Sequence, residues 1–337
     1  MINNSAPKYS KRSSFLLFIT LTTFSVTLRA QNTPTISQPA QMVDALHTVF
    51  GKHPAARAVH AKGIILTAKF TPAPQAHQLT TAPHLQQKAV LVTLRFSDFT
   101  GIPNIPDTAG ASNPRGMAVK FHLPDGSATD IVAHSFNGFP VATTDEFRAL
   151  LLAIGSSGAN ARKPTNLDKF LGTHPIAKTF LMTQKPASVS YGTLSYYGVN
   201  TFKFTNKEGK SRYARYQFIP EAGEHFLTKE QLSASGPDYL SAEIRKRVAL
   251  HPVKFKLYAQ LAEAGDKIED PSIAWPDSRK KVLLGTIEIY KAADNTPAED
   301  KELSFIPNHL PHGISIADPM LEDRSKAYPI SVKERQQ

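Results

Sequence analysis

Two stretches, IILTAKF at residues 64–70 and AVLVTLRF at residues 89–96, decide the class of fold. Both are rich in β-branched residues and alternate in polarity, which is typical of β-strands with one buried face. The sequence Pro124-Asp125-Gly126 predicts a tight turn, because proline fixes φ and glycine admits positive φ. Further strands are predicted over residues 117–123, 130–134, 201–205, 212–220, 253–261 and 282–289.

Apolar residues at helical spacing predict helices as well. Thr144 is the predicted N-cap of one of them, since its hydroxyl can accept a backbone N–H. Strands, helices and strands follow one another in blocks, which favours an α+β fold around an antiparallel sheet or barrel over β-α-β units. The helices are predicted over residues 42–50, 144–154, 167–171, 176–183 and 239–250.

The composition is that of an ordinary globular protein. The chain has 337 residues, of which 41% are hydrophobic and 20% charged, enough for a sizeable core. The formal net charge of +11 comes from scattered basic residues. We therefore expect no nucleic-acid partner, although positive charge can attract smaller anionic ligands. The chain has no cysteine, which excludes disulfides, thiolate ligands and iron–sulfur clusters.

The first thirty residues have the pattern of a secretory signal peptide. Lys8, Lys11 and Arg12 precede a mostly apolar run over residues 15–28, and Ala30 is the predicted cleavage point. The run is shorter than the ~20 residues of a membrane span. An uncleaved anchor is the alternative. Cleavage removes four positive charges, so the mature protein would carry +7.

We therefore expect residues 1–30 to be removed on export to the periplasm, with no stable membrane association afterwards. Residues 31–41 are rich in Pro, Thr, Ser and Gln and are predicted to be a linker. The remaining residues, 42–337, are predicted to form a single domain, because no internal repeat and no further linker interrupts them.

Two motifs near opposite ends of the chain carry candidate chemistry: RAVHAKG at residues 57–63 and RSKAYP at residues 324–329. His60 in the first can transfer protons. Tyr328 in the second can ligate iron as phenolate. Arg324 stands four residues before Tyr328, so in a helix its guanidinium would lie beside the phenol and favour the ionised form. Without further support, the alternative is an ordinary surface Arg–Tyr contact.

These motifs resemble those of the haem catalases, in the same order along the chain from about residue 53 to the C-terminus. Four more segments add to the resemblance: RFS at 95–97, NPRGMAVKF at 113–121, DIVAHSFN at 130–137, and SFIP with LPHGI at 304–314. The resemblance is greatest to the short catalase-related peroxidases, which keep the barrel core only. Asn113 and Asn200 depart from the family, which has aspartate and often histidine there.

The resemblance implies a catalase-like antiparallel β-barrel core with surrounding helices and one haem b per chain, with Tyr328 as the iron ligand. It implies that His60 is the distal acid–base, that Ser97 fixes its tautomer, and that Asn137 holds the peroxide through its amide. Three arginines are expected to pair with the haem propionates: Arg57, Arg95 and Arg335. Val59 would narrow access to the iron, or else pack in the core. Phe139 would line the pocket or channel, or else pack in the core.

The expected activity is that of a haem peroxidase, which reduces hydrogen peroxide or small organic peroxides with a small organic reductant and has weak catalase activity. Two alternatives keep the fold: an allene oxide synthase-like enzyme acting on fatty-acid hydroperoxides, and a haem-binding protein without turnover. A third is an exported α+β domain that binds something else. The chain is expected to be a monomer or a small homo-oligomer without bound NADPH.

Overall fold

The computed structural model of the chain describes residues 1–3 and 38–337. The predicted signal peptide from residue 4 onward, and the predicted linker up to residue 37, lie outside the described residues. Residues 38–337 belong to one compact unit. Within it, helix α1 begins at Gln38, so residues 38–41 are helical and the linker prediction was wrong there. Pro39 is tolerated because a helix leaves the first N–H groups unpaired.

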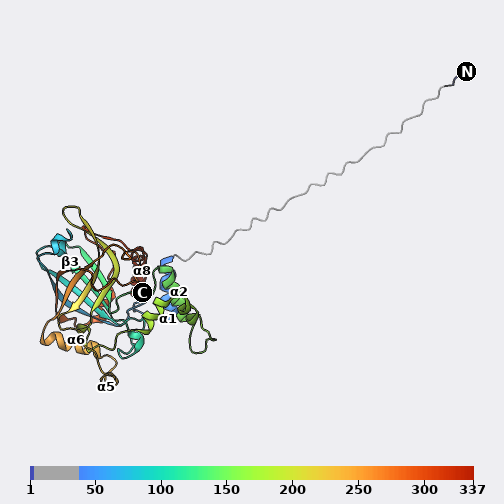
Figure 1. The fold of residues 1–337 in the computed structure, drawn as a ribbon. Helices are drawn as coiled ribbons and strands as arrows, with labels where there is room; N and C mark the ends of the chain where they lie inside the picture. Colours follow the sequence, from blue (N-terminus) through green and yellow to red (C-terminus); the bar gives the residue numbers. More distant parts are fainter. Residues whose placement is uncertain (4–37) are drawn as a thin grey trace. The chain divides into compact units, whose positions relative to one another are not determined.

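Strands β1 to β8 form a closed antiparallel barrel (Figure 1). Each of the two halves, β1–β4 and β5–β8, is a meander of consecutive neighbours; β1 pairs with β8, and β4 pairs with β5 to close the ring. A ninth strand, β9, pairs with β5. The bounds are β1 Gly63–Pro72, β2 Val90–Ser97, β3 Gly116–His122, β4 Ala128–His134, β5 Tyr196–Thr205, β6 Ser211–Pro220, β7 Val253–Leu261, β8 Lys281–Ala292 and β9 Ile314–Ile316.

Aromatic and branched side chains fill the interior of the barrel. In β2, Leu94 and Phe96 are fully buried. The ring of Phe96 stacks on Tyr191 with centroids 5.1 Å apart. Burying such a side chain contributes about 1.5–3 kcal/mol. Because successive residues of a strand point to opposite faces, Arg95 and Ser97 point outward from the barrel.

Helices cover the outside of the barrel. Helix α1 packs against α2 and α8 beside the barrel, and α6 packs against β8 (Figure 1). An apolar cluster that includes Leu46 and Leu151 joins α1 to α2. The helices are α1 Gln38–Phe50, α2 Thr144–Gly155, α3 Asn166–Thr173, α4 Pro175–Met182, α5 Lys229–Ser233, α6 Tyr239–Leu250, α7 Thr296–Glu302 and α8 Pro319–Gln336.

All eight barrel strands and five of these helices lie where the sequence predicts them, which confirms the α+β barrel fold. The predicted cap of α2 was wrong by one residue. Thr143, not Thr144, accepts the N–H of Glu146, and the Glu146 carboxylate accepts the N–H of Thr143 in return. This capping box satisfies two backbone donors at once. Helices α5, α7 and α8 and strand β9 were not predicted.

No helix in the part of the chain that the structure describes combines the length and the apolar character that a membrane crossing requires.

His84 is a core histidine whose ring packs on Phe121, with centroids 4.8 Å apart. Its Nδ1 atom is buried and has no hydrogen-bond partner among the described residues. Burial lowers the pKa of His84 from 6.5 to about 3. The pKa of His84 is lower in the folded chain than in the unfolded chain, so the unfolded chain takes up the proton first as the pH falls. The contribution of His84 to the free energy of unfolding is therefore present above about pH 6.5 and is lost as the pH falls toward 3.

We therefore expect the free energy of unfolding of His84→Leu to depend less on pH in acid than that of the wild type. Between about pH 4 and pH 6, the free energy of unfolding should fall less steeply in this variant, by about 1.4 kcal/mol per pH unit. Urea unfolding at several pH values measures the slope. His225, which is exposed, provides the control His225→Leu. Equal slopes in wild type and His84→Leu would contradict a neutral buried imidazole.

Candidate functional site

A large cavity lies between the outer face of the barrel and the helices. Its walls come from α1, the loop before β1, strands β2 to β4, the start of α2, and α8. The space not filled by protein atoms amounts to about 1360 Å³, including its open mouth. Most lining residues are apolar, among them Met42, Val43, Leu46, Phe147, Val199 and Met320. Such a cavity suits a large, mainly apolar ligand with a few polar anchors.

Tyr328 lines the cavity from α8 and is tied to the barrel by a hydrogen-bonded chain. Arg324 donates to the phenol oxygen of Tyr328 at 3.1 Å and to Oδ1 of Asn200 at 2.8 Å. Asn200 in turn donates to Asp318 at 2.7 Å. Burial raises the pKa of Asp318, and the Asn200 amide opposes that shift. The phenol oxygen that Arg324 holds is the atom through which a tyrosine ligates iron.

The helix that carries Tyr328 contains Pro329, which cannot donate a backbone N–H to Ser325. Asp318 caps its N-terminus by accepting the N–H of Met320 at 2.9 Å. Asp318 therefore has two functions. It begins α8, and it is the end of the chain of hydrogen bonds that positions Arg324 beside Tyr328.

His60 lies in the loop before β1 with φ of +57°, a left-handed conformation that is uncommon for residues other than glycine. Two contacts hold the backbone there. Its N–H donates to Phe99 at 3.0 Å, and its carbonyl accepts from Arg95 at 3.0 Å. Such strain persists only where the surroundings fix it, and it is concentrated at functional sites.

Only one of the two ring nitrogens of His60, Nδ1, has a hydrogen-bond partner among the described residues. Nδ1 lies 3.0 Å from the hydroxyl of Ser97, and the ring meets Phe99 edge-on at 5.5 Å. Nε2 has no protein hydrogen-bond partner within residues 38–337. Burial, followed by the positive charge of Arg95, lowers the pKa of His60 to about 3. The imidazole is thus neutral at physiological pH, with Nε2 available to accept and return a proton.

Three arginines line the cavity around one carboxylate, Asp300 of α7. Asp300 accepts from Arg57 at 2.7 Å and from Arg95 at 2.9 Å. Arg57 and Arg335 both donate to the carbonyl of Leu303. Burial raises the pKa of Asp300, but Arg95 and Arg57 outweigh it and hold that pKa below its ordinary value. Three guanidinium groups and one carboxylate leave two positive charges.

The structure brings together most of the side chains that the sequence singled out. Those that line the cavity are Arg57, Val59, His60, Arg95, Ser97, Phe139, Arg324, Tyr328 and Arg335. Asp300 was missed, since its carboxylate meets Arg57 and Arg95 only through contacts that are long-range in sequence.

Asn137, the residue expected to hold the peroxide, is not among the residues that line the cavity. Strand β4 ends at His134, and residues 135–138 leave the sheet, with Gly138 at φ of +140°. His134 lines the cavity instead. The signal was available, because alternation along β4 places Val132 and His134 on the outer face, opposite the buried Ile131 and Ala133.

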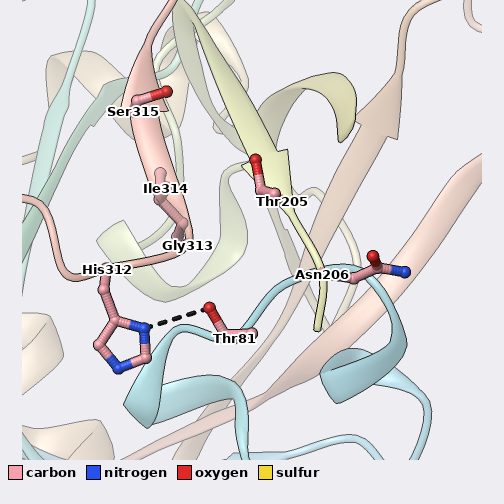
Figure 2. A pocket seen from close by; sticks show the side chains of 7 residues that line it. All are labelled: Thr81, Thr205, Asn206, His312, Gly313, Ile314 and Ser315. Carbon is pink, nitrogen blue, oxygen red and sulfur yellow. Dashed lines mark hydrogen bonds between the residues drawn. The ribbon is translucent and has the colours of Figure 1, made fainter. Parts of the chain in front are cut away.

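A second, shallow depression lies where the ends of β5 and β9 meet a loop (Figure 2). Its walls are Thr81, Thr205, Asn206, His312, Gly313, Ile314 and Ser315. Nδ1 of His312 already shares a hydrogen bond with the Thr81 hydroxyl at 3.1 Å. Because it is open to solvent, and because its one ionisable side chain is already hydrogen-bonded, we place the candidate site in the cavity that His60 and Tyr328 line.

Comparison with known proteins identifies the family of the chain. The family model described as Catalase matches residues 20–336. A catalase-related peroxidase of Mycolicibacterium paratuberculosis is 35% identical over 301 residues, covering 88% of this chain and 94% of the relative. One of Synechococcus elongatus is 31% identical over 302 residues, covering 88% of each chain.

Solved structures show the same fold. A fungal catalase and catalase A from Saccharomyces cerevisiae each match with a TM-score of 0.74, at 21% and 20% identity. The match covers 84% of this chain, which spans about three fifths of the length of those two catalases. Fold and site thus define a barrel protein with its cavity under outer helices. The chain belongs to the catalase family.

The residues of the cavity fit haem, the cofactor that this family implies. Haem b is a flat, mostly apolar ring with iron at its centre and two propionates, and the cavity offers apolar walls, a phenol oxygen, and two uncompensated positive charges. Among the described residues, no group of three or more His, Asp or Glu side chains could hold a metal ion. Tyr328, whose phenol lines this cavity beside Arg324, would hold the iron, and Arg57, Arg95 and Arg335 would hold the propionates.

Gly116 has no side chain, and the ring of His60 occupies the space beside it. A Cβ atom there would lie 2.5 Å from the Ser97 hydroxyl and 2.7 Å from Nδ1 of His60. We expect Gly116→Ala to break the Ser97–His60 contact and to lower the free energy of unfolding by about 1–3 kcal/mol through overpacking. Urea unfolding measures the loss. The matched control is Gly110→Ala, where a Cβ meets nothing within 4 Å. Equal stability of the two variants would refute the close approach.

Proposed function

We propose that the chain is a haem-dependent peroxidase that reduces hydrogen peroxide or small organic peroxides with a small organic electron donor, and that evolves oxygen only weakly. One observation carries the proposal. Tyr328, which Arg324 holds with the help of Asn200 and Asp318, borders the same apolar cavity as the neutral His60. As a member of the catalase family, the protein is an oxidoreductase that acts on peroxide.

When bound at Tyr328, haem supplies the redox-active iron for a two-electron reduction of the peroxide O–O bond. The protein supplies the proton transfer. Nε2 of His60 takes a proton from one peroxide oxygen and delivers it to the departing oxygen, so that water or an alcohol leaves. The Ser97 hydroxyl at Nδ1 holds the ring in place during both steps. Val59, next to His60 in the cavity wall, limits the size of peroxide that reaches Nε2.

Two observations favour donor oxidation over disproportionation. The two relatives of about the same length as this chain are both named catalase-related peroxidases. The cavity also has an open mouth through which a donor can reach the edge of a bound ring. The stoichiometry we propose is one haem b per chain, because the cavity contains one Tyr328–Arg324 unit and one arginine cluster.

We also propose export. The basic start, the apolar run and Ala30 support a signal peptide over residues 1–30, and the predicted location is the periplasm. The mature protein would be a single catalase-core domain. Mass spectrometry of the N-terminus after expression in a cell with an exported compartment tests the cleavage before Gln31. An N-terminus at Met1 or Ile2 would end this part of the proposal.

Replacing Tyr328 tests the cofactor. We expect Tyr328→Phe to lose haem affinity by at least about tenfold, since it removes the iron ligand and keeps the ring. Soret absorbance and the haem-to-protein ratio after reconstitution measure the loss. Tyr290→Phe, an exposed position on β8, controls for the general effect of removing a phenol. Normal haem content and activity in Tyr328→Phe would refute the assignment.

Oxygen evolution tests the activity. We expect the reconstituted protein to evolve little oxygen from hydrogen peroxide alone and to oxidise an added phenolic donor rapidly, with loss of both activities in His60→Ala. An oxygen electrode and donor absorbance measure the two rates side by side. Strong oxygen evolution that a donor barely changes would make the protein a true catalase. Full activity in His60→Ala would remove His60 from the mechanism.

A further inference from the structure

We propose that His134 is a second polar contact for the bound peroxide. In this proposal its Nε2–H donates a hydrogen bond to a peroxide oxygen, while His60 transfers the proton. The proposal rests on the function proposed above and assigns a positioning donor to the same cavity. It starts from a buried nitrogen that the protein itself leaves unpartnered.

The hydrogen bonds of His134 define its tautomer. Nδ1 accepts the backbone N–H of Phe136 at 3.4 Å, so the ring proton is on Nε2. That Nε2 atom is buried and has no hydrogen-bond partner among the described residues. A buried donor without an acceptor costs free energy, and natural proteins seldom leave one unless something else binds there. His134 lines the cavity, so a ligand in that space can supply the acceptor.

The sheet places His134 on the same side of the barrel as His60. Gly116 of β3 lies opposite Ser97 on β2 and opposite His134 on β4. Directly opposed residues share a face, so these three positions form one row on the outer face. Ser97 holds Nδ1 of His60 at 3.0 Å. Because Gly116 has no side chain, nothing from β3 stands between His134 and the region around His60.

The ring of His134 is fixed in place. The residue pairs with Tyr197 at the point where β4 and β5 close the barrel. Its ring lies edge-on to Phe180 with centroids 6.2 Å apart, and tilted to Phe139 at 6.3 Å. Donors held rigidly before the ligand arrives are the effective ones, because no reorganisation is needed at the moment of reaction.

The charge around His134 keeps it a donor and prevents it from acting as a base. The charged and titratable side chains that act on it and on its neighbour His60 are Arg324 on α8 and Arg95 on β2. Burial, followed by the charge of Arg324, lowers the pKa of His134 to about 3. The ring is therefore neutral at pH 7. With Nδ1 occupied by Phe136, it can offer a proton for hydrogen bonding but cannot remove one from the peroxide.

The closing experiment compares three variants of the haem-loaded protein. His134→Leu removes the donor at similar volume, and His134→Gln returns an N–H at about the position of Nε2. His84→Leu removes another histidine with a buried, unpartnered ring nitrogen, outside the cavity. The probe is fluoride, which accepts hydrogen bonds and donates none, titrated at pH 7 by the shift of the haem absorbance.

We expect His134→Leu to weaken fluoride binding by about tenfold or more, and His134→Gln and His84→Leu to stay within about threefold of wild type. The KM for hydrogen peroxide should rise more than kcat falls. In the protein without haem, ¹⁵N spectra of labelled histidine should show His134 protonated at Nε2 and not at Nδ1 at pH 7, and this measurement does not depend on any variant folding.

The outcomes separate the two proposals. Wild-type protein that takes up no haem would overturn the proposed function and this inference with it. Wild-type protein that takes up haem, while His134→Leu binds fluoride as tightly as His84→Leu does, would overturn this inference alone. A His134 ring protonated at Nδ1 would also overturn it, because Nε2 would then have no proton to donate.

Discussion

The site depends on one guanidinium, that of Arg324. It joins α8 to the barrel through Asn200, and it donates to the phenol oxygen of Tyr328. Its permanent charge also acts on both cavity histidines, where it adds to burial in keeping each imidazole neutral. A lysine could not serve in its place, since the two contacts use two N–H groups of a rigid planar fork. One side chain thus holds the phenol of Tyr328 and favours neutral imidazoles around the same cavity.

The barrel supplies the rigidity that this arrangement needs. The inner face of β2 is packed with Leu94 and Phe96, so its outer face can present Arg95 and Ser97 at fixed positions. Arg95 bonds the carbonyl of His60, and Ser97 bonds its ring. The strained backbone of His60 is therefore fixed by a strand that the core holds in place. His60 lies on a loop, and the sheet fixes the position of its backbone and ring.

Sequence patterns predicted the barrel because each strand alternates within itself, and the site because two short motifs contain His60 and Tyr328. They failed where the answer depends on distant partners. Helix α8 was not predicted, since Pro329 interrupts it and its charges are spread around all faces. Asp300 is one carboxylate among many until folding brings it to Arg57 and Arg95. Asn137 was chosen on the resemblance of one segment, and the alternation along β4, which places His134 on the outer face, was not considered.

The same features that suit the cavity to chemistry cost stability in acid. His60 and His134 are neutral because burial and nearby positive charge exclude a proton, and unfolding releases that constraint. Each therefore takes up a proton on unfolding below about pH 6.5, which favours the unfolded chain. A bound ligand that accepts from His134 would repay part of that cost, since it stabilises only the folded state. Filling the cavity would therefore stabilise the folded state.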